Sequence, residues 1–170
     1  MAYPNPPKTW SAAAVLTAAQ LNAELRDALN TLVPTITNTS LGWASYTPTF
    51  TQSATITKTV NYAKYIQYGK LIIANVGITA TSSGTANNAI VVGLPVTAAS
   101  GAVGAIGAAR ITDFGVSNYP CLPIVASTTT LNFLDATQAT TVFMGQTGAA
   151  FSGALGSSDS VVFVVAYEAA

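Results

Sequence analysis

From Trp43 to the end of the chain, short runs of β-branched and aromatic residues alternate with turns rich in Gly, Ser, Asn and Pro. Such runs favour strands, and no helical pattern of residues recurs between them. Crossover helices are therefore disfavoured, and antiparallel Greek-key or jelly-roll connections are preferred. We expect a mostly β fold, an antiparallel jelly-roll-like β-sandwich over residues 43–170. Its expected strands are Tyr46–Thr51, Ala54–Val60, Tyr62–Tyr68, Lys70–Thr81, Ala89–Leu94, Ala102–Thr112, Tyr119–Val125, Thr130–Leu134, Thr140–Met144 and Ser160–Tyr167.

The last expected strand is apolar at every position from Val161 to Val165. A strand with one solvated face alternates apolar and polar residues, whereas this run predicts a strand that is covered on both faces. One face then belongs to the core of the domain. The second face is a candidate subunit interface.

The first residues of the chain have a different composition. Pro4, Pro6 and Pro7 oppose both helix and sheet, and Trp10 is the one large apolar anchor near them. Residues 1–16 therefore predict an extended docking arm, ordered only when it lies against another surface. Pro4, Pro6 and Trp10 are its candidate docking residues.

An amphipathic helix is expected over residues 17–33, before a linker at 34–42. Thr17 is the expected N-cap, Gln20 completes a capping box, and Pro34 ends the helix. An apolar stripe follows heptad spacing along it, as in a trimer seam, through Leu21, Leu25, Ala28 and Leu32. Two partners for this stripe stay open, namely sister helices or the chain's own β domain, because so short a helix needs support from another body.

Charged residues make up only 7% of the chain, with six basic and six acidic side chains and a net charge of zero. No basic stripe exists, so neither nucleic acid nor an anionic membrane is an expected partner. The longest apolar run is far shorter than the roughly 18 residues of a membrane helix. A neutral surface with so few charges is typical of a chain that is buried in an assembly. The single cysteine, Cys121, is expected to be an inert buried thiol.

The chain contains no histidine, which removes the commonest general base and zinc ligand. We expect no enzyme, no catalytic residue, no metal and no cofactor. A glycosidase pair of Asp113 and Asp135 is the weaker alternative to their role as turn residues that accept backbone hydrogen bonds. Gly104 and Gly107 are expected where a strand bends or another backbone comes close, because no Lys-Ser/Thr follows to make a phosphate loop.

Three tyrosines form a spaced aromatic series. In a strand, Tyr62 and Tyr68 share one face and Tyr65 takes the other. Two roles remain open for these side chains: stacking on a sugar ligand, or contact with the core and a neighbouring subunit.

The leader resembles those of small virion proteins of tailed bacteriophages. The matching residues are Trp10, Thr17-Ala18, Leu21-Asn22 and Leu25-Arg26-Asp27. The β part is similar to the same proteins at Trp43-x-x-Tyr46-Thr47-Pro48, Tyr65-x-x-Tyr68-Gly69-Lys70, Leu94-Pro95 and the closing Tyr167-Glu168-Ala169. This family includes capsid decoration proteins, head fibres and minor tail proteins.

The resemblance implies a trimeric jelly roll that its leader attaches to a phage particle. Arm, short bundling helix and small globular domain fit a homotrimeric capsid decoration protein, whose partner is the phage major capsid protein. The alternative is a minor tail or tail-fibre-tip protein that contacts tail proteins and binds a host receptor or glycan. In both cases the expected location is the virion, assembled in the cytoplasm of the bacterial host.

Overall fold

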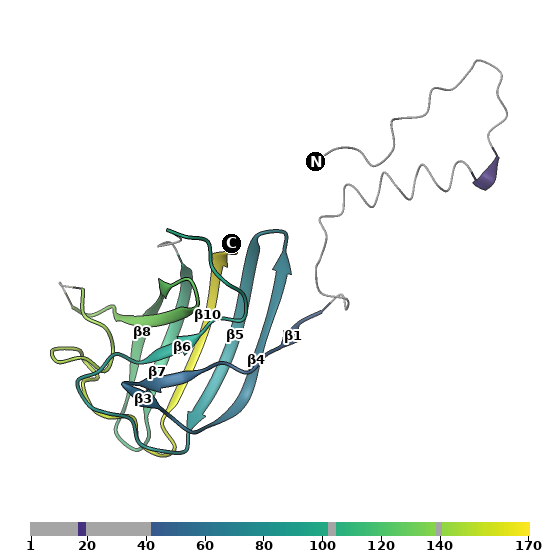
Figure 1. Ribbon diagram of the computed structural model, residues 1–170. Coiled ribbons are helices and arrows are strands. Elements are labelled where there is room, and N and C mark those ends of the chain that lie inside the picture. The colour runs from purple at the N-terminus through teal and green to yellow at the C-terminus, as the bar shows by residue number, and fades with distance from the viewer. Residues whose placement is uncertain (1–16, 20–41, 102–104, 139–140) are drawn as a thin grey trace.

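The structure is a computed structural model that describes residues 17–19, 42–101, 105–138 and 141–170 (Figure 1). The expected arm at 1–16 lies outside the described residues. Nearly all of the expected helix at 17–33 and of the linker at 34–42 also lies outside them. Within the expected helix, Ala18 and Ala19 are described and are helical. The organisation of the leader therefore stays a prediction.

The described chain from Gly42 onward is mostly β, as expected, and its strands form one antiparallel sheet. Their order in the sheet is β1-β4-β5-β10-β7-β8-β9-β6-β2-β3. The strands are β1 (Ala44–Ser45), β2 (Phe50–Gln52), β3 (Ala54–Thr55), β4 (Lys58–Tyr68), β5 (Leu71–Ala80), β6 (Val91–Gly93), β7 (Ile106–Asp113), β8 (Ser117–Ser127), β9 (Thr130–Asp135) and β10 (Ser160–Glu168).

A Greek key occupies the middle of this sheet. β7, β8 and β9 pair as consecutive hairpins, and β10 returns through a long connection to pair with β7. The spatial order β10-β7-β8-β9 is that of the Greek-key motif. The preference for antiparallel connections of this kind is therefore confirmed.

The sheet curls into a half-barrel whose concave side holds the core (Figure 1). β1 and β2 lie near opposite ends of the strand order but are joined by residues 46–49 alone. The Tyr46 amide donates to the Ala63 carbonyl on β4 at 3.0 Å, and the Gly93 amide on β6 donates to the Thr49 carbonyl at 3.0 Å. This short segment thus ties the two margins of the curled sheet together.

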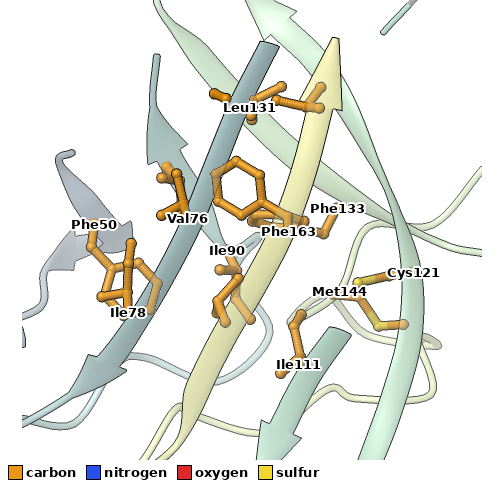
Figure 2. Packing of buried hydrophobic residues seen from close by; sticks show 14 of the residues in the cluster. Phe50, Val76, Ile78, Ile90, Ile111, Cys121, Leu131, Phe133, Met144 and Phe163 are labelled. Atoms are coloured by element: carbon orange, nitrogen blue, oxygen red, sulfur yellow. The ribbon is translucent and has the colours of Figure 1, made fainter. Parts of the chain in front are cut away.

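The core lies on the inner face of the sheet, toward which every second side chain of each strand points. Phe163 on β10 packs against Phe133 on β9 with ring centroids 5.4 Å apart (Figure 2). Both rings are buried, as are Val76 and Ile78 on β5. Full burial of side chains of this size contributes roughly 1.5–3 kcal/mol each, so packing stabilises the domain without a disulfide.

Four expected strands differ from the structure. Of Tyr46–Thr51, only Phe50 and Thr51 lie in a strand, β2. The run at Ala54–Val60 is divided between β3 and the start of β4, which continues through Tyr62–Tyr68 because a bulge at Asn61 lets Val60 pair with Ile78 and Tyr62 with Gly77. The expected strand at Thr140–Met144 is wrong over its described part, where Phe143 forms only an isolated bridge. The chain turns away at Gly145, whose φ is 94°.

Gly107 on β7 lies where the backbone of β10 comes close. A Cβ atom at this position would overlap the Val164 carbonyl oxygen and would lie 2.9 Å from the Pro123 ring. The expectation that Gly107 relieves crowding between backbones is confirmed, whereas Gly104 lies outside the described residues.

Candidate interaction surface

The largest candidate site is the outer face, which we define as the convex side of β4, β5, β10 and β7. Its side chains alternate with the core residues of the same strands. On β10, Val161, Phe163 and Val165 are buried in the core, whereas Val164 is 45% exposed. The expected second apolar face of this strand is therefore present, and nothing in the described chain covers it completely.

The register of the four strands arranges the outer face in rows. The first row is apolar throughout and contains Ile66, Ile73, Ala166 and Ile106. The second row contains Lys64, Asn75, Val164 and Ala108. The third row contains Tyr62, Gly77, Val162 and Arg110. Each row crosses all four strands, so residues far apart in the sequence form one continuous surface, apolar along the first row and mixed with Lys64, Asn75 and Arg110 in the other two.

Exposure is high along both margins of the outer face. Ile106 on β7 is 80% exposed, and Tyr62, Tyr68 and Leu71 on the β4–β5 side are also exposed. The charged residues of this face are Lys64, Arg110 and Glu168. The Nζ atom of Lys64 lies 5.4 Å from the ring centroid of Trp43, a cation–π contact. Large apolar side chains exposed together on one face favour contact with another molecule.

The structure confirms how the three tyrosines divide between faces. Tyr62 and Tyr68 lie on the outer face, whereas Tyr65 points inward and meets Tyr46 edge-on, with ring centroids 6.0 Å apart. The Tyr62 ring covers Gly77, since a Cβ atom there would lie 2.6 Å from its Cε1 atom. Tyr65 thus belongs to the core side. A ligand or subunit role for Tyr62 and Tyr68 stays a prediction.

Two buried carboxylates anchor backbone rather than line an open site. Asp135 accepts hydrogen bonds from the Thr137 amide at 2.9 Å and the Ala150 amide at 2.6 Å. Burial raises the pKa of Asp135, but these bonds and one from the Thr137 hydroxyl outweigh it, so the net shift is downward. Asp159 accepts from the amides of Phe114 at 2.8 Å and Gly156 at 2.7 Å. The turn role expected for Asp135 is confirmed.

The register separates Asp113 from Asp135. Asp113 pairs with Ser117 at the end of β7, whereas Asp135 pairs with Cys121, which in turn pairs with Ala109. The Cα atoms of the two residues are thus about 13 Å apart along the strands and about 10 Å apart across them. Glycosidase pairs lie about 5–9.5 Å apart, so the alternative of a glycosidase pair is wrong.

Cys121 is buried, and burial raises the pKa of its thiol to about 12. Within the described ranges, no three His, Cys, Asp or Glu side chains gather as a metal site would require. Among the same residues, no helix has the length and apolarity needed to cross a membrane.

The structure does not place the other predicted site residues. Pro4, Pro6, Trp10, Leu21, Leu25, Ala28 and Leu32 all lie outside the described residues. Sequence reasoning missed Ile66, Ile73 and Ile106 as members of the surface, because the strand register alone brings them into one row. The local signals that pointed to this face were the apolar run at Val161–Val165 and the spaced pair Tyr62 and Tyr68.

No protein-family model matches the chain, and no curated protein or solved structure similar to it is found.

Proposed function

We propose that this chain is a non-enzymatic structural protein of a tailed-bacteriophage particle, a homotrimeric capsid decoration protein that docks on the shell through its N-terminal arm and helix. One observation carries the proposal. A well-packed domain leaves large apolar side chains exposed on its outer face, with Val164 at its centre and Ile106 at its margin. Such a face favours assembly with other protein chains over life as an isolated monomer.

The chemistry of the described carboxylates supports a structural role. Asp135 and Asp159 each bind two backbone amides, so their oxygens hold loops in place. In this proposal the partners are two further copies of the chain and the phage major capsid protein. The location is the virion, assembled in the host cytoplasm, and neither nucleic acid nor a membrane is a partner.

The fold proposed for this function is a jelly-roll-like β-sandwich. The Greek key of β10-β7-β8-β9 supports it, because jelly rolls are built from Greek keys. In each copy, Leu21, Leu25, Ala28 and Leu32 form the trimer seam, and Pro4, Pro6 and Trp10 contact the shell.

Deletion of residues 1–16 tests the docking role. We expect occupancy on purified particles to fall to background, while the trimeric state and the circular dichroism of the isolated protein stay unchanged, because the arm adds no core of its own. Leu25→Asp is the companion variant, and we expect it to lower the trimeric mass measured by light scattering. Unchanged occupancy after the deletion contradicts the proposal.

A second candidate function, a minor tail or tail-fibre-tip protein, is favoured by the β7–β8 turn. Phe114 and Val116 are 71% and 73% exposed there, and Asp159 fixes the Phe114 amide. An ordered apolar tip is suited to contact with a receptor. Under this alternative, Phe114→Ala reduces adsorption of particles to host cells without changing occupancy, whereas for a decoration protein adsorption stays unchanged.

A further inference from the structure

The outer face has two chemically different flanks on either side of β10. The β4–β5 flank carries Tyr62 and Ile66, and the β7 flank carries Ile106 and Arg110. Val164 lies between them on β10. Because the sheet curls (Figure 1), the two flanks point in different directions. One copy therefore presents two distinct contact surfaces.

The side on which the chain enters the domain is set by Trp43. This residue directly precedes β1, and its ring lies over the ammonium group of Lys64, an outer-face residue. The leader of 41 residues therefore joins the domain beside the outer face. An axis at which three leaders meet, as proposed above, is therefore compatible with outer faces that turn toward it.

Threefold symmetry places a requirement on such a contact. A closed ring needs a heterologous interface, in which one patch of a copy meets a different patch of the next. A single flat patch instead pairs with itself and gives a twofold dimer. The two flanks of the convex outer face meet the threefold requirement.

We propose that the outer face is the contact between copies of this chain, with the β4–β5 flank of one copy packed on the β7 flank of the next and Val164 nearest the axis. This inference rests on the proposed homotrimer. When the threefold axis runs parallel to the strands, residues of one row in neighbouring copies lie at the same height along that axis. Ile66 then packs on Ile106, and the Tyr62 ring receives the Arg110 guanidinium, a favourable cation–π pair.

The width of the outer face favours a second copy of the chain, rather than the chain's own helix, as the partner that covers it. The outer face is about 15 Å wide between the axes of β4 and β7, and its side chains extend further. One α-helix with its side chains is about 10–12 Å in diameter. A single leader helix therefore covers only part of the outer face, whereas neighbouring copies cover both flanks.

Val164→Glu in the full chain tests the contact, with Val116→Glu as the matched control. Both valines are exposed, but Val116 lies in the β7–β8 turn, away from the outer face. We expect Val164→Glu to weaken the trimer at least about 100-fold, because a buried unpaired carboxylate is costly. Native mass spectrometry across a dilution series measures this, with circular dichroism as the check on folding. A folded Val164→Glu variant that dissociates no more readily than Val116→Glu overturns the proposal.

A cross-link tests which flanks meet. Ile66→Cys and Ile106→Cys together place two thiols in one row but three strands apart, about 14 Å, beyond the reach of a disulfide within one chain. We expect oxidation to give covalent trimers on a non-reducing gel, whereas the wild type, with only the buried Cys121, gives none. Products no larger than dimers indicate twofold packing and overturn the proposal, as does the absence of any cross-link.

The two proposals fail in distinguishable ways. If Val164→Glu stays trimeric while Leu25→Asp dissociates, the helix seam holds the trimer and the outer-face contact is refuted. If the wild-type chain is monomeric at the concentrations found on a particle, the proposed homotrimer itself is refuted.

Discussion

At the scale of single residues, the hydroxyl groups of Tyr46 and Tyr167 have opposite hydrogen-bonding situations. The Tyr167 hydroxyl donates to the Val96 carbonyl at 2.8 Å and accepts from the Val96 amide at 3.3 Å. The Tyr46 hydroxyl is buried and has no hydrogen-bond partner among the described residues. Burial raises the pKa of both phenols, that of Tyr167 to about 12. The two hydroxyls should therefore contribute to stability with different signs.

Replacement of each tyrosine by phenylalanine measures this difference. We expect Tyr167→Phe to lower the free energy of unfolding by about 1–2 kcal/mol, because the Val96 groups lose their partner. Tyr46→Phe should leave it unchanged or raise it by up to about 1 kcal/mol, since a desolvated hydroxyl is removed. Urea unfolding at neutral pH gives both values. Equal losses in the two variants contradict this account of the core.

At the scale of elements, Gln52 on β2 holds together loops that lie far away in the sequence. Its side chain is fully buried. Its Nε2 atom donates to the carbonyls of Asn88 at 3.2 Å and Gly153 at 2.9 Å, and its Oε1 atom accepts from the Leu155 amide at 2.9 Å. The long connection from β9 to β10 is thereby fixed to β2.

Gln52→Ala should lower the free energy of unfolding by at least about 2 kcal/mol, since it leaves three backbone groups without their side-chain partner. Gln67→Ala is the matched control, because the Gln67 side chain bonds only the nearby Gly69 carbonyl in an exposed position. Urea unfolding of both variants, with hydrogen exchange at Leu155, provides the measurement. A Gln52→Ala variant as stable as Gln67→Ala shows that the loop is held by other contacts.

Much of the element order could be predicted from the sequence, because β-branched runs and turn residues report local structure directly. β5 and β10 agree with their expected bounds within one residue. The bulge at Asn61 and the loss of the strand at Thr140–Met144 depend on pairing partners, which the local pattern does not contain. The same holds for the outer face, where Ile66 and Ile106 come together only through strand register.

The role of Gln52 had no signal in the sequence, since its partners lie 36, 101 and 103 residues away. The arm residues Pro4, Pro6 and Trp10, like the seam around Leu25, lie outside the described residues and remain predictions.

At the scale of the whole molecule, the core and the outer face lead to one account. The concave side of the sheet buries enough apolar surface to hold the domain together, while the convex side leaves an apolar face exposed. The chain carries few charges with which to keep isolated copies apart. The account therefore predicts a protein that functions as part of an assembly, with the leader as its attachment.

A density map of the whole phage particle tests this central claim most directly. The account predicts three copies of the chain around a threefold axis on the head shell. Their arms should lie on the major capsid protein, and their outer faces should turn toward that axis. Density for the chain on the tail, as a single copy, or nowhere on the particle contradicts it.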